Sequence, residues 1–130
     1  MTAEPDRVPS VLLVDDEARV LSALERSLRR EGWAIRTAES PREALRILEE
    51  DSVDLVLSDH KMPGMTGAQF LEMVRRRYPH TVRLLLTGWA EALTAEEMAA
   101  AGIEEVVSKP WDDAELRALL RTHLVSPESV

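Results

Sequence analysis

The feature that most constrains this chain is a series of short hydrophobic runs, each ending at a chemically useful side chain. VLLV leads to Asp15 and Asp16, VDLVLS to Asp59, VRLLL to Thr87, and EVVS to Lys109. Short apolar runs bounded by turn signals are typical of strands that are buried on both faces of a parallel sheet. In an open parallel sheet, ligands bind just beyond the carboxyl ends of the strands. The sequence therefore predicts that three acids, a hydroxyl and an ammonium group converge at one sheet edge.

Segments with helix-capping patterns alternate with these runs. Ser40, Thr66, Thr94 and Asp112 are each followed three residues later by Glu or Gln, which is the pattern of a helix start. Alternating strands and helices predict an α/β fold with right-handed crossovers. Five such units fit a flavodoxin-like doubly wound sandwich, with a five-stranded parallel sheet in the order 2-1-3-4-5. We expect the strands at about residues 10–14, 33–37, 53–58, 82–86 and 105–107.

That strand order places the acidic residues at a single crevice. Strands one and three flank the point where the order reverses, and Asp15, Asp16 and Asp59 lie at their ends. Three neighbouring carboxylates repel one another unless a cation is present. Magnesium prefers one or two carboxylates together with water and phosphate oxygens. Asp59 could then act as a carboxylate nucleophile that forms an acyl phosphate, with Thr87 and Lys109 stabilising the transferred charge.

Length and composition set limits on the domain and its partners. The chain has 130 residues, 45% of them hydrophobic, which suits one folded domain. We expect that domain at residues 10–124, with a flexible N-terminal arm at 1–9 and a C-terminal tail at 125–130. The net charge of −8 argues against direct binding of nucleic acid. The absence of cysteine excludes disulfides and thiolate metal sites. No apolar stretch is long enough to cross a membrane, so we expect a cytoplasmic protein.

Four sequence segments together resemble a known family. VLLVDDE, LSDHKMPGMTG, LLLTGWA and SKPWD, taken in order and at these spacings, are similar to the receiver domain of two-component response regulators. The resemblance covers roughly residues 10 to 124. It implies a phosphorelay module that takes a phosphoryl group from a phosphohistidine onto Asp59. It implies that the chain is not an enzyme, apart from catalysing phosphoryl transfer to itself and its own slow dephosphorylation.

The resemblance also implies a role for each site residue. Asp16 would bind Mg²⁺ directly, Asp15 mainly through water, and Lys61 through its backbone carbonyl. Thr87 would bond the phosphoryl group and Lys109 would pair with it, next to a cis peptide between Lys109 and Pro110. The implied partners are a sensor histidine kinase or phosphotransfer protein and a downstream effector or output domain. A second copy of the chain, in a homodimer, is a further candidate partner.

Two positions depart from the family pattern. Val106 stands where the family usually has Phe or Tyr, three residues before the motif lysine. A valine has few rotamers, so the usual aromatic switch is in doubt. Thr66 and Gly67 stand where Asp-Gly is common, and the threonine can still cap the helix that follows. Trp89 and Trp111 each follow a site residue by two positions, and either packing or a lid role fits them.

Two other functions remain as alternatives. A degenerate receiver would serve as an interaction module without phosphorylation, but such domains lose an acid, the phosphoacceptor or the lysine. An aspartate-nucleophile phosphohydrolase needs a second Asp two residues after the nucleophile, where this chain has Lys61. It also usually needs a cap domain, for which 130 residues leave no room. Both a stand-alone receiver and one domain of a longer protein fit the sequence.

Overall fold

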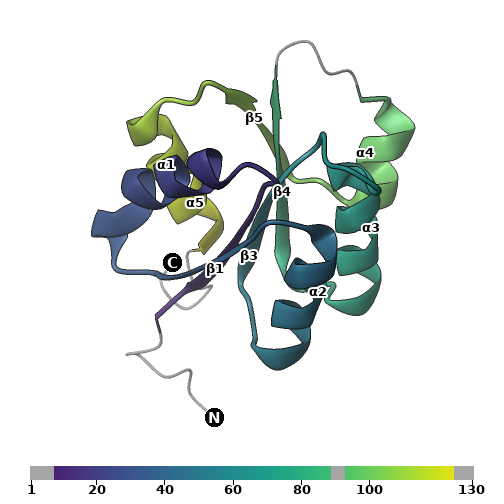
Figure 1. Cartoon of the computed structure of the whole chain (residues 1–130), viewed down its shortest axis with the longest axis horizontal. Helices are drawn as coiled ribbons and strands as arrows, with labels where there is room; N and C mark the ends of the chain where they lie inside the picture. Colours follow the sequence, from purple (N-terminus) through teal and green to yellow (C-terminus); the bar gives the residue numbers. More distant parts are fainter. Residues whose placement is uncertain (1–7, 89–92, 125–130) are drawn as a thin grey trace.

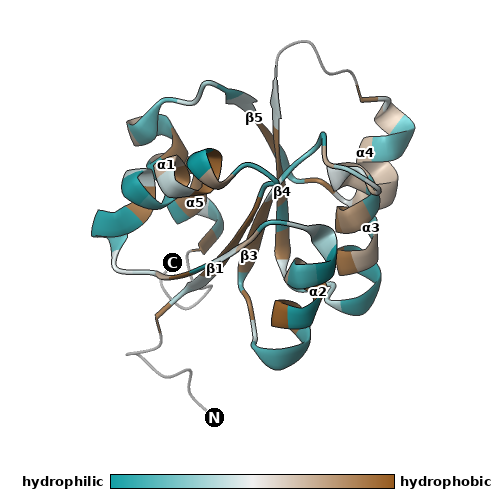
Figure 2. Cartoon of the chain, viewed as in Figure 1, coloured by the Kyte–Doolittle hydropathy of each residue, from teal (hydrophilic) through white to brown (hydrophobic). Residues whose placement is uncertain are grey.

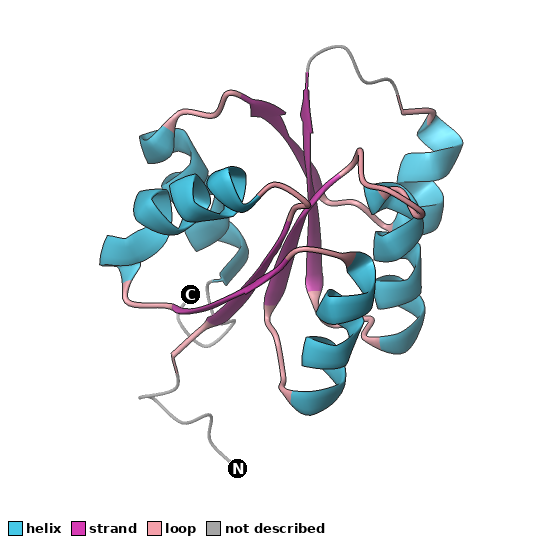
Figure 3. Cartoon of the chain, viewed as in Figure 1, coloured by secondary structure: helices cyan, strands magenta, loops and turns pink. Residues whose placement is uncertain are grey.

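Five parallel strands form the sheet of this protein, in the order β2-β1-β3-β4-β5. The computed structural model describes residues 8–88 and 93–124. The expected flavodoxin-like topology is confirmed, and Figure 3 shows the strands as a twisted central layer. The strands are β1 (Ser10–Val14), β2 (Ala34–Ala38), β3 (Leu55–Asp59), β4 (Val82–Gly88) and β5 (Glu105–Lys109).

Helices cover both faces of the sheet. One face is covered by α1 and α5, and the other by α2, α3 and α4 (Figure 1). Each layer of helices buries its own hydrophobic cluster against the strands, and the strands are accordingly the most apolar part of the molecule (Figure 2). The helices are α1 (Ala18–Leu28), α2 (Pro41–Glu50), α3 (Gly67–Arg77), α4 (Ala95–Ala101) and α5 (Asp113–Leu124), with a 3-10 turn at Arg29–Glu31.

The helix starts follow the capping patterns in the sequence. Thr66 and Thr94 each accept a hydrogen bond from the backbone N–H three residues on and form reciprocal capping boxes. Ser40 accepts from the Glu43 N–H, but the Glu43 carboxylate accepts from the N–H of Glu39 instead of Ser40. The helix starts are therefore determined locally by the capping residues. This holds whether the N-cap residue or the residue before it donates the second hydrogen bond.

The strand boundaries differ from the expected ones where the site is built. The sequence places Asp59, Thr87 and Lys109 just after their strands, whereas the structure includes all three in β3, β4 and β5. The ladder continues past the apolar runs, because Asp59 aligns with Leu86, and Gly88 aligns with Lys109. These residues are therefore held by strand hydrogen bonding on at least one side, which limits their backbone motion.

Burial differs between the central and the edge strands. Strand β3 is buried throughout, whereas β2 and β5 each have one buried residue and are otherwise partly or fully exposed. The prediction of strands buried on both faces therefore holds best for the centre of the sheet. Val106 lies on β5 and is 40% exposed, so this position could accommodate the larger aromatic ring typical of the family.

Parts of the chain fall outside the described residues. Residues 1–7 and 125–130, which contain most of the predicted arm and tail, are among them, as is Trp89. Within 8–88 and 93–124, no helix has the length and apolar character needed to cross a membrane.

Candidate functional site

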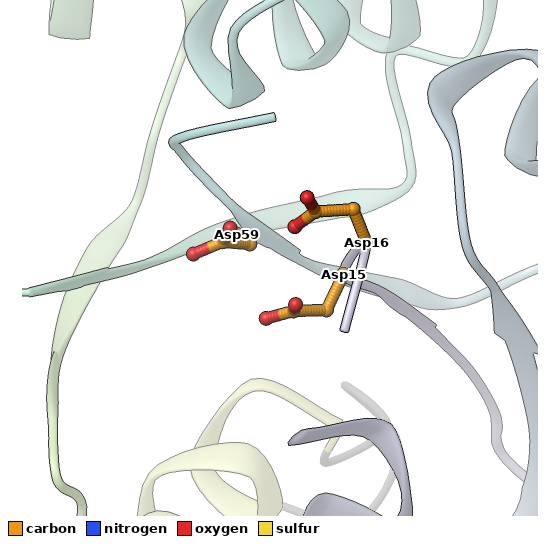
Figure 4. Close-up of side chains that lie close together, drawn as sticks. All are labelled: Asp15, Asp16 and Asp59. Atoms are coloured by element: carbon orange, nitrogen blue, oxygen red, sulfur yellow. The ribbon is translucent and has the colours of Figure 1, made fainter. Parts of the chain in front are cut away.

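Three carboxylates meet at the carboxyl edge of the sheet, as the sequence predicts. Asp15 and Asp16 follow β1 and Asp59 ends β3, and these strands are neighbours. One ligand oxygen from each of the three lies within 4.8 Å of the other two (Figure 4). Asp15 and Asp59 are buried, whereas Asp16 is exposed. The convergence follows directly from the strand order, because β1 and β3 flank the switch point of the fold.

Lys109 reaches this acidic cluster from the far edge of the sheet. Its Nζ lies 2.8 Å from Asp59 Oδ1 and 3.3 Å from Asp15 Oδ2. The sequence predicts pairing of Lys109 with a phosphoryl group, and the structure adds that the ammonium bridges the two buried carboxylates. Burial lowers the pKa of Lys109, but its hydrogen bond to Asp59 and the two negative charges outweigh this, so the pKa lies above its ordinary value. The lysine is therefore charged across the physiological range.

Asp15 is held in an environment that disfavours its charge. Burial raises the pKa of Asp15, and the Asp59 carboxylate raises it further. The Glu17 backbone N–H, which donates to Asp15 Oδ1 at 2.8 Å, and Lys109 act in the opposite direction. The balance leaves the pKa of Asp15 above its ordinary value. Burial is thus the main reason why the charged form of Asp15 is disfavoured, and one ammonium group does not fully offset it.

This raised pKa predicts a pH-dependent cost to stability in the absence of divalent cations. A carboxyl whose pKa is higher in the folded state favours folding when protonated, and this contribution is lost as the pH rises through the folded pKa. Asp15→Asn removes the titration. We expect its free energy of unfolding to gain on that of the wild type as the pH rises from about 4, the ordinary pKa of an aspartate, through the raised pKa of Asp15. Urea unfolding with a chelator present measures this difference, and a constant difference across that range would contradict the prediction.

Thr87 lies beside the carboxylates on the neighbouring strand β4. It is buried and aligns with Ser108, one residue beyond Leu86, which aligns with Asp59. The Leu86 carbonyl accepts a hydrogen bond from the His60 N–H at 3.1 Å, so the ends of β3 and β4 are tied together next to Asp59. Lys61 has an exposed side chain, and the role of its backbone carbonyl as a metal ligand stays a prediction. The peptide between Lys109 and Pro110 is cis, which confirms that expectation.

The sequence alone does not reveal the importance of Gly67 for this site. Gly67 begins α3, and its N–H donates to the His60 carbonyl at 2.7 Å. A Cβ atom at this position would lie 2.1 Å from the Asp59 carbonyl oxygen and 2.8 Å from the His60 Cα. Gly67 is not among the glycines with a positive φ, so space alone requires it. Its sequence signals are the glycine of the Asp-Gly pair common in the family and its place directly after a capping threonine, where a good helix former would otherwise stand.

The donor atoms of the cluster suit a hard divalent cation. They are all carboxylate oxygens, which are the ligands of Mg²⁺ and Ca²⁺, and two of the three residues are buried beside only one ammonium group. Among residues 8–88 and 93–124, this is the one group of three or more acidic, His or Cys side chains close enough to share an ion. The acidic triad is thus compatible with metal binding.

Comparisons with known proteins agree with this geometry. Hydrogenase transcriptional regulatory protein HoxA of Cupriavidus necator is 39% identical over 110 residues, which cover 82% of this chain and 22% of that protein. Response regulator protein FleR of Pseudomonas aeruginosa is 35% identical over 113 residues, which cover 87% of this chain and 24% of that protein. The chain thus spans about a quarter of the length of these two relatives.

Solved structures give the same result. The signal receiver domain of an HD domain-containing protein from Pseudomonas fluorescens superposes with a TM-score of 0.84 at 35% identity, covering 95% of this chain and 91% of that one. Chemotaxis response regulator CheY4 of Vibrio cholerae superposes with a TM-score of 0.82 at 31% identity, covering 91% of this chain and all of that one. The family model for the response regulator receiver domain matches residues 11–121. By fold, site and sequence, the chain belongs to the response regulator receiver domain family.

Proposed function

We propose that Asp59 accepts a phosphoryl group from a phosphohistidine on a sensor histidine kinase or phosphotransfer protein. The observation that carries this proposal is the placement of Asp59, a buried carboxylate at the switch point, within reach of two other acids and the ammonium of Lys109. Receiver domains are signalling modules, not true enzymes. The chemistry required of the chain is therefore one phosphoryl transfer onto its own side chain, followed by slow hydrolysis.

Each neighbouring group has a distinct part in that transfer. An Asp59 oxygen attacks phosphorus as the N–P bond of the phosphohistidine breaks, and the electron pair of that bond stays on the imidazole. Negative charge then builds on the phosphoryl oxygens. The ammonium of Lys109 pairs with the Asp59 carboxylate before transfer. From this position it can pair with the phosphoryl oxygens as they become more negative. The Thr87 hydroxyl, at the end of the adjacent strand, is the second donor that we assign to the phosphoryl group.

A Mg²⁺ ion completes the proposed site. Asp16 and Asp59 would hold it directly, with Asp15 acting mainly through water and Lys61 through its backbone carbonyl. When bound, the ion neutralises the acidic cluster and offsets charge on the phosphoryl oxygens. The exposure of Asp16 supports its direct role, because an exposed carboxylate loses less hydration when it binds a cation.

The domain limits and partners are also proposals. The family match to residues 11–121 and the run of elements from β1 to α5 support a receiver domain at 10–124, flanked by short segments at 1–9 and 125–130. The named relatives are longer transcriptional and response regulators, which supports an output domain or separate effector as the target of the switch. A cytoplasmic location and a homodimer stay predictions.

Phosphorylation by a small donor tests this function. We expect acetyl phosphate with Mg²⁺ to add a single phosphoryl group, because the site brings nucleophile, ammonium and acids together without a kinase. Intact mass spectrometry measures the addition, and hydroxylamine should remove it, as for an acyl phosphate. A chelator should prevent the reaction. No incorporation by a folded protein saturated with Mg²⁺ would favour the degenerate receiver, and release of free phosphate in many turnovers would favour a phosphohydrolase.

A further inference from the structure

We propose that Ser27, Trp111 and Asp113 position Lys109 for phosphoryl transfer, by fastening the loop after β5 to helix α1. We call these three residues the indole anchor. The inference rests on the proposed function, since it assigns a role in the same reaction to residues outside the acidic site. None of the three touches the reacting atoms, so each is a positioning residue and not a catalytic one.

The indole anchor is a closed triangle of hydrogen bonds. Trp111 Nε1 donates to Ser27 Oγ at 2.9 Å and to Asp113 Oδ1 at 3.1 Å. Ser27 Oγ and Asp113 Oδ1 are 2.5 Å apart, closer than the 3.1 Å between Ser27 Oγ and the Ala23 carbonyl. The single hydroxyl proton therefore goes to the Asp113 carboxylate, and the serine oxygen accepts from the indole. The charged Asp113 carboxylate strengthens the hydrogen bonds that it accepts from Ser27 and Trp111.

Ser27, the α1 residue of the triangle, is held in place by the packing of its helix. Ser27 is 6% exposed, and its helix buries Leu21, Leu24 and Leu28 against the sheet. The Ser27 carbonyl also accepts from Arg117 Nη1 on α5 at 3.1 Å. The hydroxyl of Ser27 therefore has a fixed position relative to the core, and whatever it binds is fixed with it.

The other side of the triangle controls the residue that follows Lys109. Strand β5 is an edge strand, so its backbone pairs only with β4, and the ladder ends where Gly88 aligns with Lys109. Beyond Lys109 the chain runs through Pro110 to Trp111, whose indole is held by the triangle. The backbone of Lys109 is thus held by the ladder before it and by the indole anchor two residues after it. Release of the anchor would leave the end of an edge strand with support on one side.

Lys109 depends on such support more than most site residues. Its Nζ contacts Asp59 at the end of β3 and Asp15 directly after β1. These strands lie two and three places away in the sheet. A long side chain with many rotamers reaches so far only from a well-placed backbone. Small displacements of a group that stabilises a transition state reduce the rate strongly. The acids lie on or directly after the central strands, and their backbone does not depend on the anchor. Loss of the anchor should therefore slow phosphoryl transfer without weakening cation binding, because a displaced ammonium competes less with a cation for the carboxylates.

A packing role for Trp111 alone predicts a different outcome. The indole packs against the cluster between the sheet and the α1–α5 layer, and this contact would persist without the hydrogen bonds. Loss of the Ser27 hydroxyl removes the acceptor that links the indole to α1 and leaves the apolar contact in place. The effect of Ser27→Ala on the reaction therefore separates positioning from packing.

The rate of phosphorylation by acetyl phosphate tests the indole anchor. We expect Ser27→Ala and Asp113→Asn each to slow incorporation into the full chain about tenfold, with no increase in the Mg²⁺ concentration at half-saturation. Ser22→Ala makes the same chemical change at an exposed position of α1 and should react like the wild type. Two variants are used so that, if one fails to fold by circular dichroism, the other still decides the question.

A double-mutant cycle shows whether the effect passes through Lys109. In a Lys109→Ala background, adding Ser27→Ala should cause no further loss of rate. A further tenfold loss of rate in the Lys109→Ala background would overturn the inference. So would single variants Ser27→Ala and Asp113→Asn that react as fast as Ser22→Ala. These results are distinct from failure of the proposed function, which would appear as no phosphorylation of the wild type itself.

Discussion

Replacing Asp59 with Asn is expected to abolish phosphorylation of this chain, with a fall in rate of about 10³-fold or more. The amide has nearly the shape of the carboxylate but lacks the anionic oxygen that attacks phosphorus. It can still accept a hydrogen bond from Lys109, whose Nζ lies 2.8 Å from Asp59 Oδ1. The change therefore removes the nucleophile and leaves the surrounding geometry largely intact.

Asp59→Asn should not lower the stability of the fold, although it abolishes phosphorylation. The substitution removes the negative charge that, together with burial, raises the pKa of Asp15, so repulsion within the cluster falls. In the absence of a divalent cation we expect unfolding in urea at an equal or higher concentration than for the wild type. Loss of activity can then be assigned to chemistry and not to unfolding.

Asp51→Asn provides the matched control. Asp51 follows α2, and its exposed carboxylate pairs with Arg36. It lies before the amino end of β3, whereas Asp59 lies at the carboxyl end, so this change removes the same charge away from the site. We expect phosphoryl incorporation to equal that of the wild type. If Asp59→Asn incorporated as much phosphoryl group as Asp51→Asn, a different side chain would be the acceptor and the assignment of Asp59 would fail.

Gly67→Ala should have the largest effect on the fold itself. The added Cβ would lie 2.1 Å from the Asp59 carbonyl oxygen and 2.9 Å from its carbonyl carbon, and these backbone atoms belong to a buried central strand. Either α3 or the end of β3 must move, which we expect to cost about 3 kcal/mol of unfolding free energy. Because the clash is with the backbone of Asp59, phosphorylation should fall even in the folded fraction. Urea unfolding and mass spectrometry measure the two effects separately.

Gly32→Ala separates this clash from ordinary backbone strain. Gly32 ends the first helical segment at a φ of +78°, and a Cβ there meets nothing within 4 Å. Alanine is strained in this left-handed conformation, so the replacement should lower the free energy of unfolding by about 1 to 2 kcal/mol. It should leave phosphorylation unchanged. Equal losses for the two variants would show that α3 yields easily and that Gly67 does not constrain the site.

The sequence by itself determined the order of the elements and the location of the site. Apolar runs, capping residues and turn signals act over a few neighbouring residues, so they predict α/β alternation without any tertiary contact. The strand order 2-1-3-4-5 then brings Asp15, Asp16 and Asp59 together, because the carboxyl ends of parallel strands share one edge. The family resemblance carried the assignment further, to individual roles.

Only the tertiary structure decided the contacts between residues far apart in the chain. The strands extend through Asp59 and Lys109 because neighbouring strands continue the ladder there, which a single strand's sequence does not show. The link from Trp111 to Ser27 joins residues 84 positions apart, and Gly67 is required by the backbone of another element. Such contacts depend on the distances at which packed helices and strands settle, and these distances arise from the whole core and not from any local pattern.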